Sequence, residues 1–115
     1  ENSWKEISGR FESKIIAWSG YENIRAFSWQ KQLHIFEVPF YYIEYGMAQL
    51  GAIALWREYK LNPAAAIRNY ESALKLGYSR AIGEIFVEAG VKFEFSAEYI
   101  HELMNFVKSE LQKLK

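Results

Sequence analysis

Cysteine is absent from this 115-residue chain, which excludes disulfide scaffolds, cysteine-based zinc sites and thiol catalysis. An excess of one charge is also missing, because 14 basic residues balance 14 acidic ones; a nucleic-acid-binding surface would carry a basic excess. The first twenty residues lack a basic segment followed by an apolar run, so no signal peptide is predicted in them. A glycine-rich phosphate loop and a G-x-S-x-G nucleophile elbow are missing as well.

Apolar residues, in contrast, make up half of the chain, and this is enough to build the core of one small domain. We therefore expect residues 1–115 to form a single helical domain. The first residue is Glu1 rather than Met, so we expect this domain to be a piece of a longer protein or a trimmed chain. The aromatic content is high, at 17%, which is typical of side chains that pack a core or line a pocket.

The spacing of the apolar residues predicts an all-α fold with about five helices. Residues 40–60 are apolar on nearly all sides and are predicted to form a central helix that is mostly buried. The stretch contains Glu44 and two glycines, so a core helix is favoured over a membrane span. Residues 34–38 are predicted to be a loop or extended segment, because a proline disfavours helical geometry in the residue before it. The other helices are predicted over residues 4–18, 63–76, 79–89 and from 97 towards the end, with a further short helix over about 23–33.

Several residues are predicted to begin or end these helices. Ser3 and Glu6 have the spacing of a capping box. Asn62 stands before a proline, as an N-cap residue often does, and Gly77 occupies the position of a C-cap glycine. Ser96 is predicted to cap the last helix. Residues 91–95 alternate between apolar and polar but have no partner strand, so they are expected to form an extended connector that places two phenylalanines, Phe93 and Phe95, in the core.

A zinc-binding helix is not predicted. The sequence His101-Glu102-Leu103-Met104-Asn105 is similar to H-E-x-x-H, but that motif needs a second histidine one helical turn after the first. Asparagine stands at that position, so we expect His101 to be a solvated residue and the chain to bind no metal through this segment.

His34 precedes a row of tyrosines, which are Tyr41, Tyr42 and Tyr45. On a helix, Tyr42 and Tyr45 would share one face, and so would Tyr41 and Tyr45. A histidine beside several phenols offers hydrogen-bond donors around one point, as the stabilisation of an oxyanion requires. The alternative is a packed aromatic core with a satisfied histidine.

The residues from His34 to Ala52, HIFEVPFYYIEYGMAQLGA, resemble the C-terminal segment of oligoendopeptidase F, a zinc metallopeptidase of the thimet oligopeptidase-like family. The likeness extends from about Trp29 to the end of the chain, and the first twenty residues fit it less distinctively. The resemblance implies the C-terminal part of a mostly helical, two-lobed fold around a channel in which short peptides are cut internally. It also implies that His34, Tyr42 and Tyr45 bind the peptide backbone and stabilise the oxyanion, whereas Tyr41 matches a substrate-binding position less well.

The zinc-binding H-E-x-x-H helix of that family is absent from these 115 residues and would lie upstream. We therefore expect a substrate-binding and transition-state-stabilising portion that is inactive alone and holds no cofactor, with Zn²⁺ bound by the intact enzyme. The expected partners are short peptides and the N-terminal catalytic portion of the same polypeptide, without nucleic acid or membrane. The missing portion would leave an aromatic surface exposed, which predicts either a homodimer of the fragment or a solvent-facing groove lined by His34, Tyr42 and Tyr45. The family and the lack of a signal peptide together suggest a cytoplasmic location.

Two other readings remain open. Residues 62–90 have the pattern of one helix-turn-helix repeat of the tetratricopeptide kind, but a solenoid needs about three repeats to bury a core. The alternative function that this pattern suggests is a helical module that binds a partner peptide without catalysis. A purely structural helical bundle is favoured if His34 and the tyrosines lie far apart.

Overall fold

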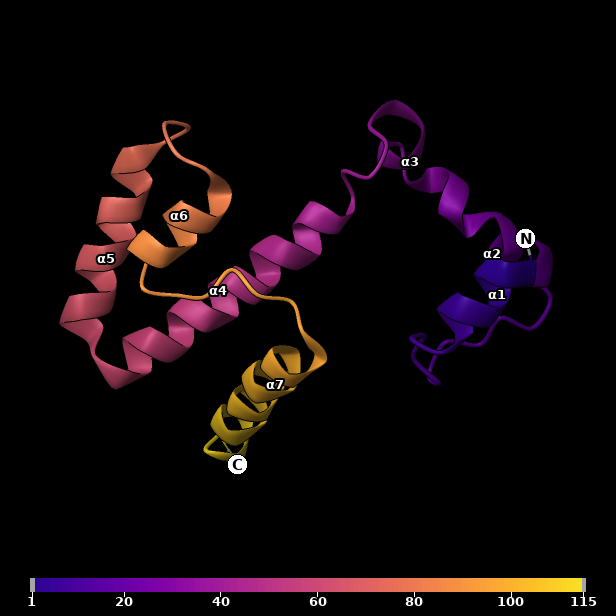
Figure 1. The fold of residues 1–115 in the computed structure, drawn as a ribbon. Helices are drawn as coiled ribbons and strands as arrows, with labels where there is room; N and C mark the ends of the chain where they lie inside the picture. Colours follow the sequence, from indigo (N-terminus) through magenta and orange to yellow (C-terminus); the bar gives the residue numbers. More distant parts are fainter. Residues whose placement is uncertain (1, 115) are drawn as a thin grey trace. The chain divides into compact units, whose positions relative to one another are not determined.

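The computed structural model describes residues 2–114, and in this range it is all-helical, as the apolar spacing predicts. It contains seven α-helices and one short 3₁₀-helix over those residues rather than about five helices. The chain divides between Tyr42 and Ile43 into two compact units (Figure 1).

The first unit is built from short helices: α1 (Asn2–Gly9), α2 (Glu22–Phe27), the 3₁₀-helix η1 (Ser28–Lys31) and α3 (His34–Glu37). Polar contacts connect α1 and the segment after it with α2 and η1. The Trp4 indole Nε1 donates a hydrogen bond to Ser28 Oγ at 3.0 Å, and the Arg25 guanidinium pairs with the Glu12 carboxylate at 2.8 Å. Ala26 is the one apolar side chain of the described part of this unit that is buried.

The predicted first helix is too long and its cap is misplaced. Helix α1 begins at Asn2, so Ser3 lies inside it and is not the N-cap. The helix ends at Gly9, where the Ser8 carbonyl accepts hydrogen bonds from the amides of Phe11 and Glu12 and closes the turn. Glycine is a poor helix former. The apolar residues beyond it are not packed against the rest of the unit, since Phe11 and Ile15 are 80% and 93% exposed. The 3.6-residue period therefore does not extend the helix.

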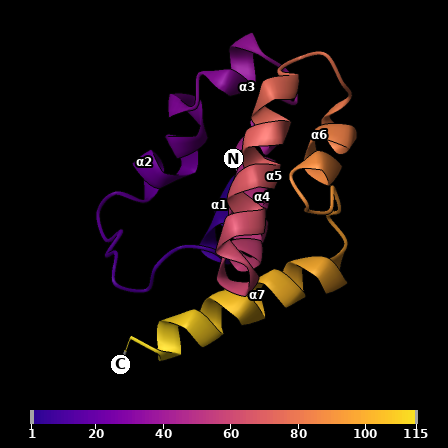
Figure 2. The same ribbon diagram turned by 90° about the vertical axis from the view of Figure 1, so that its left-hand side faces the viewer.

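The second unit contains the longer helices: α4 (Ile43–Leu61), α5 (Pro63–Leu76), α6 (Ile82–Glu88) and α7 (Ala97–Gln112). Helix α4 packs against both α5 and α7, and α5 packs against α6 (Figures 1 and 2). The buried core joins α4, α5, α7 and the segment after α6; it comprises Ala54, Ala73, Ala89, Val91, Tyr99 and Leu103. Ile85 and Phe86 of α6 are partly buried and pack against it. Helix α4 is thus the central helix of this unit.

Helix α4 is less buried than its apolar sequence predicts, because Gly51 and Ala54 are its only buried residues. Its small residues account for the close packing that does occur. A Cβ atom on Gly51 would lie 3.0 Å from Cε1 of Phe86, so the absence of a side chain makes room for that ring. The apolar residues at the start of α4 face solvent instead, and Ile43 is 68% exposed.

The predicted caps of the later helices are confirmed. Asn62 Oδ1 accepts a hydrogen bond from the Ala65 amide at 3.1 Å, and Ser96 Oγ accepts one from the Tyr99 amide at 3.2 Å. Gly77 follows α5 with a φ of +53°, a conformation that glycine adopts without steric cost. Helix α6 begins three residues later than Ser79, because the Ser79 hydroxyl donates to the Leu76 carbonyl and so closes the preceding helix.

The segment between α6 and α7 is extended and forms no strand. Phe93 is half-buried and makes edge-to-face contacts with Phe86 and Phe95, both at 5.0 Å between ring centroids. Phe95 itself is 38% exposed, so the expectation that it lies in the core is wrong. It covers Phe93 from outside instead.

Ion pairs connect α4 and α7. Arg57 contacts Glu102 at 2.6 Å, and Lys60 contacts Glu110 at 2.9 Å. Glu110 also pairs with Lys113 and is only 8% exposed. Hydrogen bonds from the Lys113 ammonium, and then from that of Lys60, lower the pKa of the Glu110 carboxyl below its ordinary value of 4.5.

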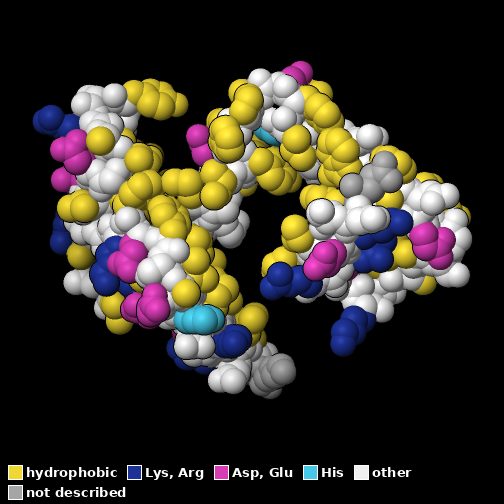
Figure 3. Space-filling view, turned by 45° about the vertical axis from the view of Figure 1, so that its right-hand side comes forward, with side chains coloured by type: hydrophobic (Ala, Val, Ile, Leu, Met, Phe, Trp, Pro, Cys, Tyr) yellow, Lys and Arg dark blue, Asp and Glu magenta, His cyan; other side chains and the backbone are white. Residues whose placement is uncertain are grey.

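On the face shown in Figure 3, hydrophobic side chains are exposed among charged ones of both signs. None of the helices in residues 2–114 has both the length and the apolar character needed to cross a membrane.

Candidate functional site

His34 lies at the start of the four-residue helix α3, not in a loop. The prediction of an extended segment is correct only for Val38, whose φ and ψ are −135° and 86°. A proline restricts the residue directly before it and leaves earlier residues free to be helical. Pro39 therefore ends α3 after Glu37 without unwinding it, and the His34 side chain is half-buried.

A tight turn follows α3. The Tyr41 amide donates to the Val38 carbonyl at 3.2 Å, with Pro39 and Phe40 as the two central residues and a positive φ of 64° at Phe40. Proline at the second position and a positive φ at the third are features of a type II turn. The turn reverses the chain and brings the two tyrosines that follow it back towards α3.

Two phenol rings lie against the His34 imidazole as a result. The Tyr41 ring is stacked on it, with 6.0 Å between centroids and 4° between the ring planes. The Tyr42 ring is tilted by 52° at a centroid distance of 5.7 Å. We call these three residues the His34 cluster. Both tyrosines are nearly half exposed, at 42% and 48%, so the cluster is accessible to a ligand.

The helical geometry expected for the tyrosines is wrong in one respect. Helix α4 begins at Ile43, so Tyr41 and Tyr42 precede it and do not share a helical face with Tyr45. Tyr45 lies in the first turn of α4, in the second unit, and is 54% exposed. The turn at Val38–Tyr41, rather than a helical period, is what places phenols beside the histidine.

The His34 cluster can act chemically as a set of hydrogen-bond donors. An imidazole has at least one N–H group and each phenol has one O–H group. Donors that converge on one point can bind a carbonyl oxygen and bind it more strongly as it gains negative charge.

Residues 2–114 contain no group of three His, Asp or Glu side chains that could hold a metal ion. His101 is exposed on α7, and the neighbouring Glu102 pairs with Arg57 at 2.6 Å. His101 and Glu102 therefore do not provide a zinc ligand set.

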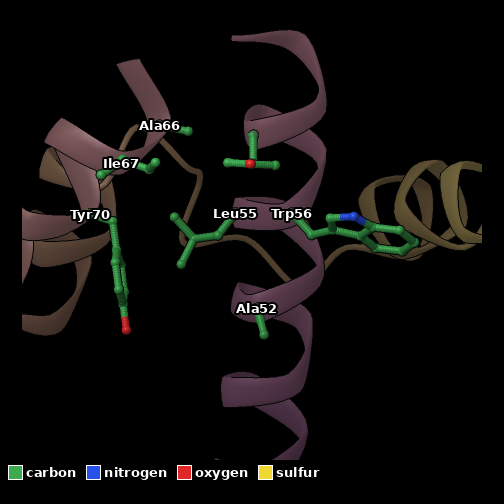
Figure 4. A pocket seen from close by; sticks show the side chains of 7 residues that line it. Ala52, Leu55, Trp56, Ala66, Ile67 and Tyr70 are labelled. Atoms are coloured by element: carbon green, nitrogen blue, oxygen red, sulfur yellow. The ribbon is translucent and has the colours of Figure 1, made fainter. Parts of the chain in front are cut away.

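A second candidate site is an apolar groove between α4 and α5. A cavity of about 300 Å³ is lined by Ala52, Leu55, Trp56, Tyr59, Ala66, Ile67 and Tyr70 (Figure 4). A neighbouring cavity of about 260 Å³ extends towards α6 and shares Ala52, Leu55 and Tyr70 with the first. We call this pair of cavities the α4–α5 groove. The apolar pattern of residues 40–60 predicts a mostly buried helix and therefore gives no signal for this groove.

No family model, no curated protein and no solved structure matches this chain. The resemblance to a known family therefore depends on the residues from His34 to Ala52 themselves.

Proposed function

We propose that this chain is the C-terminal, substrate-binding portion of a cytoplasmic zinc-dependent oligoendopeptidase, which hydrolyses short peptides internally. The observation that carries the proposal is the His34 cluster. An imidazole lies within 6.0 Å of two phenol rings, centroid to centroid, inside the segment that resembles oligoendopeptidase F.

In this proposal, the cluster holds a carbonyl of the peptide backbone. His34 and Tyr42 donate hydrogen bonds to the carbonyl oxygen. Tyr45, in the first turn of α4, is assigned a role in the same step by the resemblance alone. When the carbonyl carbon becomes tetrahedral, its oxygen gains negative charge and these hydrogen bonds strengthen. Tyr41 is stacked on the imidazole, where it fixes the ring plane and binds substrate. Zinc would be held by the upstream part of the polypeptide, where it supplies activated water.

The first partner in this proposal is a short peptide, and the second is the N-terminal catalytic portion of the same polypeptide. Without that portion the chain binds peptides, does not cleave them, holds no metal and forms a homodimer through its exposed aromatic side chains. Neither nucleic acid nor membrane is a proposed partner, in accord with the balanced charge.

The test is an NMR titration of the 115-residue chain with a blocked nonapeptide. We expect shifts of the ring signals of His34 and Tyr42, and an affinity about three- to tenfold lower for Tyr42→Phe because one hydrogen bond is lost. Tyr78→Phe is the matched control, since Tyr78 is fully exposed and lies outside the His34 cluster. Absence of binding would refute the proposal. Zinc-dependent cleavage of the peptide by this chain alone would contradict the inactivity of the fragment.

A second candidate function is supported by the α4–α5 groove. An apolar groove between two helices can accept the apolar face of a partner helix, so the chain would be an interaction module without catalysis. The same titration distinguishes the two functions, because this one predicts shifts at Leu55 and Ile67 and none at His34. Ile67→Glu, at a half-exposed groove position, would then abolish binding.

A further inference from the structure

Phe40 occupies the third position of the turn that precedes the His34 cluster's tyrosines. Its φ is +64°, and it is the only non-glycine residue with a positive φ in residues 2–114. The third position of a type II turn normally carries glycine or asparagine, because a side chain crowds the backbone there. A phenylalanine at this position is a conformational outlier.

Packing in the core does not account for the backbone conformation of Phe40. The Phe40 side chain is 96% exposed, so its ring contributes little to packing. Glycine would adopt this positive φ more easily than phenylalanine does. A bulky side chain kept in a strained and exposed conformation points to a contact with something outside the chain, because strained residues cluster at functional sites.

The position of Phe40 indicates what this contact is. It is two residues from Tyr42, so their Cα atoms are less than about 8 Å apart. Adjacent residues of an extended peptide are about 3.3 Å apart along the chain, so a peptide held at the His34 cluster carries its neighbouring side chains past the turn. A phenyl ring in that position contacts an apolar or aromatic side chain best.

We propose that Phe40 is a specificity-determining residue, which receives an aromatic or large aliphatic side chain of the peptide next to the carbonyl held by the His34 cluster. This inference rests on the proposed function and adds the substrate class: peptides with a bulky apolar residue near the bound carbonyl.

The test uses the 115-residue chain and two blocked nonapeptides that are identical except for phenylalanine or glycine at the central position. NMR titration gives the affinity of each, from the ring signals of His34 and Tyr42. We expect the phenylalanine peptide to bind about three- to tenfold more tightly. Phe40→Gly, which suits the positive φ and preserves the turn, should remove this preference, so that the two peptides bind with equal affinity. Phe40→Leu should retain most of it.

The matched control is Phe11→Ala. Phe11 is another highly exposed phenylalanine of the first unit, and it has no positive φ, so its removal should not alter the preference. If wild type and Phe40→Gly bind both peptides equally well, the specificity proposal is refuted while the proposed function stands. If neither peptide shifts the His34 cluster, both are refuted.

Discussion

Replacing Tyr99 by phenylalanine should stabilise the second unit, and this prediction tests the core directly. Tyr99 is 3% exposed and lies in the cluster around Leu103. Its hydroxyl oxygen is buried and has no hydrogen-bond partner among the described residues. A buried hydroxyl that has given up water without gaining a partner costs about 1–3 kcal/mol.

The substitution should change little else. The Arg57 guanidinium and the Lys92 ammonium lie 5.8 Å and 5.4 Å from the centre of the Tyr99 ring, and a phenylalanine ring keeps both cation–π contacts. The lost van der Waals contacts of one oxygen offset part of the gain. We therefore expect Tyr99→Phe to raise the free energy of unfolding by about 1 kcal/mol, which is a rise in Tm of about 4–8 °C for a unit of this size.

Urea unfolding followed by circular dichroism, together with amide hydrogen exchange in α7, measures this change for the second unit. Tyr78→Phe is the control, because the Tyr78 side chain is fully exposed and its change should stay within about 0.5 kcal/mol. A loss of 1 kcal/mol or more in Tyr99→Phe would refute the reasoning, because it would mean that the hydroxyl makes a stabilising hydrogen bond.

Further predictions concern the same unit. The pKa of Glu110 is lowered, so its ion pairs stabilise the fold above pH 4.5 and are lost as the pH falls through the lowered pKa. In Glu110→Gln, the free energy of unfolding measured in urea should therefore depend less on pH between pH 5 and 3. The same pH dependence in wild type and variant would contradict this. Asn62→Ala should cost about 1 kcal/mol, because it removes the N-cap of α5, and urea unfolding without any loss would disprove the role of the cap. Gly46→Ala should stabilise α4 by about 0.5–1 kcal/mol, since its Cβ would meet nothing within 4 Å. Gly51→Ala should not stabilise α4, since its Cβ would lie 3.0 Å from the Phe86 ring; equal Tm values for the two glycine variants would contradict the assigned contact.

The sequence predicted three helix ends correctly, at Asn62, Gly77 and Ser96, where the decisive group lies within a few residues. The side chains of Asn62 and Ser96 accept hydrogen bonds from amides three residues later, and Gly77 supplies its positive φ by itself. These are local interactions between neighbours in the sequence, so they can be inferred without knowing what packs against the helix.

The sequence was misleading where packing or a turn decides. Residues 10–18 have helical spacing, but Phe11 and Ile15 are 80% and 93% exposed, and most helix stability comes from tertiary packing of the apolar face. At the candidate site, the expected helix from Phe40 was interrupted by the turn at Val38–Tyr41. Proline at its second position was visible in the sequence, but a phenylalanine with positive φ could not be anticipated, because that conformation is unfavourable for the residue.

The aromatic content illustrates why composition alone does not locate a core. Of the phenylalanines, tyrosines and tryptophans in residues 2–114, Tyr99 alone is buried. The core instead contains alanines of α4, α5 and the segment after α6, because small residues allow helix backbones to approach one another. The aromatic rings are consequently left for surface contacts, at the His34 cluster and along the α4–α5 groove.

Because the chain divides after Tyr42, amide hydrogen exchange can distinguish which of these two surfaces binds a ligand. A ligand that binds only the folded state stabilises it by RT ln(1 + [L]/Kd), which is about 2.7 kcal/mol at a ligand concentration of 100 Kd. The His34 cluster lies in the first unit and the α4–α5 groove in the second, so the ligand protects amide hydrogens in the unit that holds its site. A saturating peptide that slows exchange in α2 and α3 supports the peptidase portion. Slower exchange confined to α4 and α5 supports the interaction module.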